Sequence, residues 1–414
     1  MAQLHDMKQE EERIILVGVS LHDKDDTEES LDELEELAKT AGAVTVKKVI
    51  QNRESVHPGT YIGKGKIAEI KELLYELNAT TIVCDDELSP AQIKNLEMEL
   101  DAKVIDRTVM ILDIFASHAS TREGKIQVEL AQLKYRSSRL VGLGKSLSRL
   151  GGGIGTRGPG EKKLEMDRRF IRDRISQLNK ELDEVKQARE TTRKQRSKNP
   201  VPIVAIVGYT NAGKSTLLNT LTDAKVLEAD KLFATLDPTT RNLVLESGQQ
   251  ILITDTVGFI RKLPHHLIDA FKSTLEEAKY SDIIIHVVDS ANETVYNQMH
   301  TVYETLRNLD VKDKVIITAF NKQDKLEVEQ ILKDFQADKT VKISAKTGEG
   351  IKELLDTLEV VLQERKVYIE KVYSYQDAGK LQIIRKYGQL IEEEYREDGI
   401  FIKAYVPREV YLGL

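Results

Sequence analysis

The chain has no tryptophan, and aromatic residues make up only 5% of its 414 residues. Its cores must therefore be mostly aliphatic, and a hydrophobic content of 40% is enough to build them. A single cysteine, Cys84, excludes a disulfide within the chain and favours a reducing, intracellular compartment. Because Cys84 ends the apolar run "TTIVC", we expect it to be a small core residue.

Long hydrophobic runs are also missing. No stretch of about 18 apolar residues is present, and the N-terminal sequence "MAQLHDMKQEEERII" lacks an apolar signal segment. We therefore expect no membrane span and a cytoplasmic protein, for which a transient association with membranes stays open. We also expect the chain to act as a monomer.

The net charge of −7 is unevenly distributed along the chain. Residues 121–200 contain 21 Lys plus Arg but only 10 Asp plus Glu, a net charge of +11, so the remainder carries −18. Long exposed helices are often rich in charge, and a helical pair could simply dimerise, but both readings predict balanced charges. The excess instead predicts a polyanionic partner for this part of the chain.

The order of apolar patterns predicts an α/β multidomain protein. Short apolar runs alternate with amphipathic stretches over residues 13–120, which is typical of a small, mainly parallel sheet covered by helices. Within it, Ser89 and Pro90 are suited to begin a helix. We expect a small α/β subdomain at 1–120, an antiparallel helical hairpin at 121–199, a mainly parallel nucleotide-binding domain at 200–365 and a small α/β domain at 366–414, with strands "KVYIEKV" and "GIFIKAYVP".

The hairpin is predicted from two apolar stripes with helical spacing, joined by a glycine-rich tip. Ile126, Leu130 and Leu133 belong to the first stripe, and Ile175 and Leu178 to the second. The tip, "GGGIGTRGPG" at 151–160, lacks both a preceding strand and a G-K-[ST] ending, so it is not a nucleotide loop. With Tyr135 and Phe170 as the only aromatics of the pair, RNA recognition should rest on charge and shape. The candidate RNA contacts are Arg149, Arg157, Lys162, Lys163, Arg168 and Arg169.

The strongest motif is "GYTNAGKS", Gly208 to Ser215, which follows the strand "PIVAIV" and precedes the helix "STLLNTL". This context identifies a P-loop. The two glycines let backbone amides converge on phosphates at a helix N-terminus. Lys214 can then reach the β- and γ-phosphates, and the Ser215 hydroxyl can bind Mg²⁺.

Three shorter motifs follow, each at the end of a predicted strand. In "DTVG", Asp255 can hold Mg²⁺ through water and the Gly258 amide can meet the γ-phosphate. In "NKQD", the Asp324 carboxylate can accept two N–H groups of guanine, a donor pair that adenine lacks. "SAK", Ser344 to Lys346, would close over the base. Four motifs in this order indicate a GTP site at the carboxyl edge of the sheet.

The segment "LFATLDPTTR", residues 232–241, has the position of a nucleotide switch. One of its threonines should complete the Mg²⁺ shell when the γ-phosphate is present, and Thr235, Thr239 and Thr240 are candidates. Thr235 lies 20 residues after Ser215 and 20 before Asp255.

These motifs, together with "HPGTYIGKGK", "GGGIGTRGPGEKKLEMDRR", "FATLDPTTR" and "DTVGFI", resemble the HflX family of ribosome-associated GTPases over residues 13 to about 365. The resemblance selects Thr235 as the metal threonine. It implies binding of GTP or GDP, of the large ribosomal subunit and of the 70S ribosome. It further implies splitting of stalled or idle ribosomes, particularly under heat stress, and a link of some relatives to resistance against ribosome-targeting antibiotics. In this family the glycine-rich tip points toward the peptidyl-transferase region.

The predicted site contains three groups with a catalytic role: Lys214, Thr235 and Gly258. Its metal ligands are Ser215 and Thr235, with Asp255 acting through water. The nucleotide-binding residues, taken motif by motif, are Gly208, Tyr209, Thr210, Asn211, Ala212, Gly213, Lys214, Ser215 and Thr216; Phe233, Ala234, Thr235, Leu236 and Asp237; Asp255, Thr256, Val257 and Gly258; Asn321, Lys322 and Asp324; and Ser344, Ala345 and Lys346.

Two positions bear on hydrolysis. Ras-like enzymes place a water-orienting Gln after the "DxxG" glycine, and here that position is Phe259, so we expect slow intrinsic hydrolysis that a partner stimulates. Asn211 is either a turn-former or, as in related GTPases, a ligand of K⁺ beside the phosphates, and both readings stay open.

Other features of the sequence have simpler interpretations than a second catalytic or metal site. "YIGKGK" at 61–66 is interpreted as a helix start or RNA contact rather than a second nucleotide loop, and His265 and His266 as a surface helix start. The acidic groups Asp85–Asp86 and Glu392–Glu394 are interpreted as solvated loops or helix faces. Two alternatives to ribosome splitting stay open: a GTPase of ribosome assembly or tRNA modification, and a nucleotide-sensing RNA-binding module that prevents subunit association.

Overall fold

The computed structural model describes residues 11–21, 26–147, 159–196, 201–222, 232–233, 236, 238–263, 277–328 and 330–411. The chain divides into two compact units, which are described separately. The first contains residues 1–182, 230–233 and 261–271, and the second contains 183–229, 234–260 and 272–414. Among the described residues, no helix combines the length and apolar character needed to cross a bilayer.

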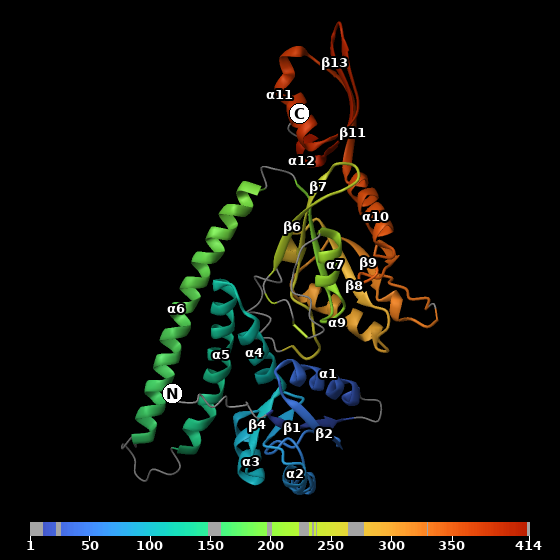
Figure 1. The fold of residues 1–414 in the computed structure, drawn as a ribbon. Coiled ribbons are helices and arrows are strands. Elements are labelled where there is room, and N and C mark those ends of the chain that lie inside the picture. The colour runs from blue at the N-terminus through green and yellow to red at the C-terminus, as the bar shows by residue number, and fades with distance from the viewer. Residues whose placement is uncertain are drawn as a thin grey trace, which may run out of the picture. The chain divides into compact units, whose positions relative to one another are not determined.

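The first unit is built on a four-stranded parallel sheet of order β2-β1-β3-β4. In Figure 1, α2 and α3 cover one face of this sheet and α1 lies on the other. The strands are β1 (Arg13–Ser20), β2 (Val44–Asn52), β3 (Thr81–Cys84) and β4 (Lys103–Asp106), and the helices are α1 (Thr27–Thr40), α2 (Lys64–Glu76), α3 (Pro90–Leu100) and α4 (Arg107–His118).

Two local predictions for this unit are confirmed. Ser89 forms a capping box with Gln92 at the start of α3, where Pro90 is the first helical residue. Cys84 is fully buried within the apolar cluster between the sheet and α2 and α3.

One prediction for this unit is wrong. Asp85, expected in a solvated loop, is 1% exposed and pairs with the buried Arg107. The reason is tertiary: β3 ends in the middle of the sheet, so the residue after it lies beneath α1 rather than in water.

The helical hairpin consists of α5 (Arg122–Leu147) and α6 (Pro159–Arg196), which lie side by side in Figure 1. The predicted stripes meet, because Ile126, Leu130, Leu178 and Leu182 form one buried cluster. Arg174 on α6 donates to both carboxylate oxygens of Glu129 on α5, at 2.7 and 2.9 Å. The boundary between the two units falls within α6, after Leu182.

The second unit begins with a six-stranded sheet of order β10-β9-β8-β5-β7-β6, in which only the pairing of β6 with β7 is antiparallel. This confirms the predicted mainly parallel sheet. Its strands are β5 (Ile203–Gly208), β6 (Thr239–Val244), β7 (Gln250–Asp255), β8 (Ile283–Asp289), β9 (Val315–Asn321) and β10 (Lys339–Lys342). Helices α7 (Lys214–Thr222) and α10 (Ile351–Glu364) pack on one face, and α9 (Val295–Asn308) packs on the other.

A small α/β element ends the chain, as predicted. An antiparallel sheet of order β11-β13-β12 packs against α11 (Ala378–Tyr387) and α12 (Arg408–Tyr411). Its strands are β11 (Lys366–Tyr373), β12 (Gln389–Arg396) and β13 (Gly399–Pro407).

The interpretation of Glu392–Glu394 as a loop or helix face is wrong, because these residues belong to β12, an edge strand with a bulge between Leu390 and Glu392. Each of the three glutamates has a cation as its partner: Lys403 for Glu392, Arg385 for Glu393 and Arg396 for Glu394.

Candidate nucleotide site

The P-loop joins the end of β5 to the start of α7, so its amides gather at the N-terminus of that helix. The Lys214 side chain is buried and reaches back over the loop, where its Nζ donates to the Tyr209 carbonyl at 2.7 Å. Asn211 adopts a φ of 59°, a left-handed conformation that Asn tolerates better than most residues. This conformation accounts for an asparagine at the position whether or not a cation binds there.

The predicted metal ligands of the P-loop and of "DTVG" are in contact. The Ser215 hydroxyl donates to the Asp255 carboxylate at 2.8 Å, and Asp255 is fully buried at the end of β7. A hydroxyl and a carboxylate oxygen are hard ligands of the kind that Mg²⁺ prefers. The pair therefore fits a Mg²⁺ ion beside the P-loop.

Asn321, at the end of β9, connects three of the motifs. Its Nδ2 donates to the carbonyl of Ala212 in the P-loop at 2.8 Å, and its Oδ1 accepts from the amide of Ala345 in "SAK" at 2.9 Å. Since Asn321 is 2% exposed, these bonds are protected from water. The side chain thus holds the phosphate-binding loop and the base-binding loops in a fixed relation.

The base-binding residues are positioned by their neighbours. Ser344 donates through its hydroxyl to Asp324 at 2.6 Å, which orients an exposed carboxylate at the sheet edge. Lys322 pairs with Asp289 at 2.7 Å. Asp289 was not singled out by the sequence, although its place at the end of the buried strand "IIIHVVD" could have suggested it.

The segment after β7 lies on the P-loop. The Phe259 amide donates to the Gly208 carbonyl at 3.1 Å, and the Thr210 amide donates to the Phe259 carbonyl at 2.7 Å. Phe259 is 2% exposed, so the residue at the position of the water-orienting Gln is buried and apolar. Its side chain cannot orient an attacking water.

Several predicted residues are not brought to this site by the described structure. Phe233 belongs to the first unit, where its ring packs edge-on against Phe115 with centroids 4.7 Å apart. Two of the predicted RNA contacts lie on α6. Arg168 bonds to the Leu140 carbonyl at 2.6 Å, whereas the Arg169 side chain is 82% exposed. The predicted residues that lie outside the described residues or side chains are Ala234, Thr235, Asp237, Arg149, Arg157, Lys162, Lys163, His265 and His266.

Three family models match successive parts of the chain. Residues 28–116 match the family described as GTP-binding GTPase N-terminal, residues 118–196 match GTP-binding GTPase Middle Region, and residues 203–322 match 50S ribosome-binding GTPase. The GTPase HflX of Lacrimispora saccharolytica is 69% identical over 414 residues, which cover 100% of this chain and 98% of the relative. The chain belongs to the GTPase HflX family.

Other relatives span much of the chain as well. The GTPase HflX of Escherichia coli K12 is 44% identical over 84% of this chain and 82% of its own length. The structure of a GTP-binding protein from Sulfolobus solfataricus in complex with GDP matches 84% of this chain and 98% of its own, with 27% identity and a TM-score of 0.45. Membership of the HflX family confirms the predicted enzyme class: the chain is a GTPase.

Protonation of Lys214 should be coupled to nucleotide binding by this HflX-family GTPase. Burial lowers the pKa of Lys214 to about 8, with Asp255 opposing and Lys322 adding to the shift. Phosphates favour the charged ammonium, so binding raises this pKa and takes up a proton wherever the free protein is partly neutral. We expect an uptake of about 0.5 proton per GTP at pH 8 and about 0.1 at pH 7. Calorimetry in buffers of different ionisation enthalpy measures this uptake, and no uptake at pH 8 would contradict the assignment.

Proposed function

We propose that this GTPase, in its GTP-bound state, binds the large ribosomal subunit and separates stalled or idle 70S ribosomes into subunits under heat or antibiotic stress. The observation that carries the proposal is the net charge of +11 on residues 121–200. A basic segment of this kind is an electrostatic footprint for RNA phosphates. The match of residues 203–322 to the family described as 50S ribosome-binding GTPase supports the large subunit as the source of that RNA.

Some cations of the hairpin take part in its packing, and others are exposed. Its two helices are joined by the apolar cluster and by the paired Arg174 and Glu129, and Arg168 bonds to the Leu140 carbonyl. The Arg169 side chain is 82% exposed, and its ion pair with Asp173 within the described part of the hairpin is long, at 3.9 Å. Such side chains can contact phosphates without first breaking a strong ion pair.

Nucleotide binding provides the switch in this proposal. Ser215, with Asp255 through water and Thr235 from the segment 232–241, would hold Mg²⁺, which neutralises phosphate charge when it is bound. The γ-phosphate would order the segments 232–241 and 255–263 and favour the ribosome-binding state. Because Phe259 cannot orient water, hydrolysis would be slow until the ribosome completes the site. Hydrolysis would then weaken the complex and release the protein.

Sedimentation of 70S ribosomes with the full chain tests the proposal. We expect free subunits with GTP and with a non-hydrolysable analogue, but not with GDP, because binding rather than hydrolysis supplies the energy for splitting. Turnover of GTP should be much faster with ribosomes than without them. Splitting by GTP alone, with none by the analogue, would show that the proposed order of binding and hydrolysis is wrong.

A tip deletion provides the matched variant. Replacing residues 151–160 by a short linker should leave GTP affinity unchanged, because the nucleotide motifs lie elsewhere, and should abolish splitting. Full splitting by this variant would exclude the tip from the action. If the protein binds precursor particles or tRNA and has no effect on 70S ribosomes, a role in ribosome assembly or tRNA modification is favoured. If it binds a subunit but its GTP turnover is not stimulated, an RNA-binding module that prevents subunit association is favoured.

A further inference from the structure

The base-binding loop "NKQD" is held along its length by the end of the neighbouring strand β8 and the residue after it. Asp289 is opposite Asn321 in the parallel register of β8 and β9. The Ser290 amide donates to the Asn321 carbonyl at 3.0 Å, and the Ser290 hydroxyl accepts from Gln323 Nε2 at 2.9 Å. Between these two contacts, Lys322 donates through Nζ to Asp289 at 2.7 Å. Three consecutive residues of the loop thus each bond to this short stretch of chain.

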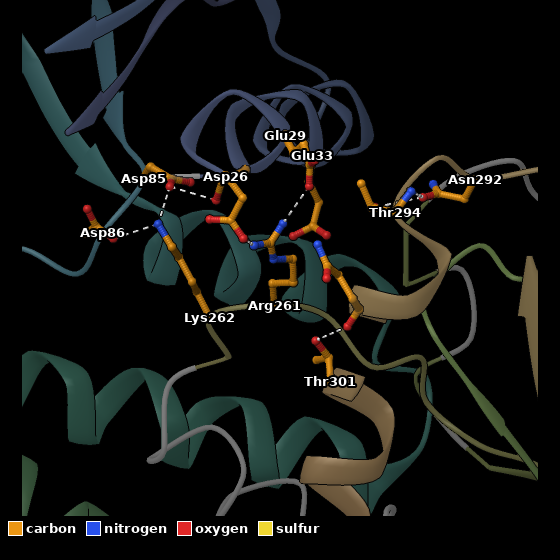
Figure 2. Close-up of polar contacts among 12 residues, drawn as sticks. Asp26, Glu29, Glu33, Asp85, Asp86, Arg261, Lys262, Asn292, Thr294 and Thr301 are labelled. Carbon is orange, nitrogen blue, oxygen red and sulfur yellow. Dashed lines mark hydrogen bonds and ion pairs between the residues drawn. The ribbon is translucent and has the colours of Figure 1, made fainter. Parts of the chain in front are cut away.

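The turn that follows β8 is built by its own local hydrogen bonds. Asp289 Oδ1 accepts from the Ala291 amide at 3.1 Å. Asn292 accepts from both the amide and the hydroxyl of Thr294, at 2.9 and 2.8 Å, and Figure 2 shows these two residues together. Aspartate and asparagine side chains that accept from the amide two residues on form turns of this kind. We call residues 289–294 the brace.

The contacts of the brace with the loop are shielded from water. Ser290 is fully buried, and the side chains of Asp289 and Lys322 are 17% and 16% exposed. Polar groups that are mostly withdrawn from water leave a larger penalty when one partner is removed than groups on the surface do. The brace is therefore a stronger support for the loop than a surface ion pair would be.

The loop requires such support because Lys322 has an unfavourable backbone conformation. Its φ is 63°, in the left-handed region that residues other than glycine rarely adopt. A conformation of this kind persists where the surrounding contacts impose it. If Lys322 returned to an ordinary φ, the direction of the chain would change just before Asp324, the carboxylate predicted to read guanine. A contact that fixes Lys322 therefore also bears on the direction of Asp324.

The contacts on the phosphate side of the site lie outside the brace. Lys214 bonds to the Tyr209 carbonyl, and Ser215 bonds to Asp255. The bonds of the Asn321 side chain to the P-loop and to "SAK" also use atoms that the brace does not contact. A weakened brace should thus change the contacts with the base more than the contacts with the phosphates.

We propose that Asp289 and Ser290 are positioning residues for guanine recognition. By fixing residues 321–323 they hold Asp324 in the direction in which its carboxylate can accept from both N–H groups of the base. They thereby slow the release of GTP and GDP alike. This role depends on the predicted contact of Asp324 with guanine, and it is independent of any action on ribosomes.

Asp289→Asn tests this role in the isolated full chain, without ribosomes. The variant keeps the size of the side chain and an oxygen that can accept from the Ala291 amide, so the turn is retained and the charge beside Lys322 is lost. We expect GDP to be released about tenfold faster, because the loss of such a contact falls mainly on the dissociation rate. GTP should be released faster by a similar factor, since both nucleotides carry the same base. Stopped-flow release of fluorescent GTP and GDP measures the two rates.

Inosine triphosphate separates positioning from a general loss of stability. Its base lacks the 2-amino group of guanine, so it offers Asp324 one N–H group instead of two. A loosely held carboxylate gains less from the second donor, and the preference for GTP over inosine triphosphate should fall about three- to fivefold in Asp289→Asn. A merely destabilised fold would lower both affinities equally. In the background of Asp324→Asn, Asp289→Asn should leave this preference unchanged, because the carboxylate through which it acts is gone.

Two further variants complete the test. Ser290→Ala removes the hydroxyl that accepts from Gln323, and it should change the release rates and the base preference in the same direction by a smaller factor, since Gln323 keeps its bond to the Phe320 carbonyl. Asp282→Asn is the matched control. Asp282 immediately precedes β8 at the opposite end of the strand, where it accepts from the Ile203 amide at 2.9 Å. This control should keep the release rates and the base preference of the wild type.

Competition binding with GTP and inosine triphosphate decides the outcome. An unchanged base preference in folded Asp289→Asn would overturn the proposal even if release became faster, because the brace would then support the site as a whole rather than the reading of guanine. An equal fall of the preference in Asp282→Asn would overturn it as well. If Asp289→Asn does not fold, Ser290→Ala is judged by the same criterion.

Discussion

Replacing Asp324 with Asn should lower the affinity for GTP by about 100-fold or more while sparing the fold. The carboxylate is the group that can accept both the N1–H and the 2-amino group of guanine. Asn offers one acceptor and one amide N–H₂, so an N–H donor of the protein would face the 2-amino group of the base, and buried donors left unpaired are costly. The Ser344 hydroxyl can still donate to the amide oxygen of Asn, so the loop should keep its place.

Xanthosine triphosphate provides the internal check on this prediction. Xanthine carries an oxygen where guanine carries the 2-amino group, so the Asn amide can donate to it while its oxygen accepts from N1–H. The variant should therefore bind xanthosine triphosphate better than GTP, reversing the wild-type order. Competition binding with the two nucleotides and with ATP measures the order, and loss of both affinities would mean that Asp324 supports the loop rather than reading the base.

The residues of this site that could be predicted from the sequence are those that belong to short motifs at or just after the end of a strand. Asp255 ends a strand, and Lys214, Ser215 and Asp324 come shortly after strands, each strand having a recognisable apolar pattern. Parallel strands bring their carboxyl ends to one edge of the sheet. The bond of Ser215 to Asp255 follows from this geometry without any knowledge of side-chain packing. The order of the motifs therefore carried most of the information about the chemistry.

The remainder depends on contacts between residues that are far apart in the sequence. Asp85 is a charged residue after a short strand and looks solvated until Arg107 and Lys262 are placed beside it. Lys262 lies 177 residues beyond Asp85, and no local pattern connects them. In the same way, the spacing of "NKQD" predicts a base-binding loop but not that Asn321 spans the P-loop and "SAK". Pairing partners of this kind are fixed by topology, which composition and periodicity do not reveal.

The strand β12 shows a different limit. Its sequence "QLIEEEYR" has three consecutive acids, which is more typical of a solvated helix face than of a strand. It forms an edge strand because a bulge absorbs the irregular register and because Lys403, Arg385 and Arg396 neutralise the acids. Arg396 ends the strand itself, but Lys403 lies on β13 and Arg385 on α11, so the local sequence does not indicate these two partners.

The bridge made by Asn321 explains why Gly213→Ala should abolish nucleotide binding. Gly213 has a φ of 97°, and a Cβ at this position would lie 2.3 Å from Asn321 Nδ2. The side chain would have to push Asn321 away, which breaks its bonds to Ala212 and Ala345 together. The phosphate-binding and base-binding loops would then lose their common support. We expect the affinities for GTP and GDP to fall by about 100-fold or more, since two buried hydrogen bonds are lost with the geometry of the loop.

Gly248→Ala separates this effect from backbone strain. Gly248 also has a positive φ, 78°, but among the described residues no atom beyond Gly248 and its two chain neighbours lies within 4 Å of a Cβ placed there. Both variants carry a similar strain of about 1 kcal/mol, and only Gly213→Ala adds the clash with Asn321. We expect Gly248→Ala to lower the melting temperature slightly and to bind GTP like wild type, whereas Gly213→Ala should lose both stability and binding. Equal nucleotide binding by the two variants would contradict this explanation. The hydrogen bonds of Asn321 would then not be needed to hold the phosphate-binding and base-binding loops, and the positions of the strand ends would be enough to bring these loops together.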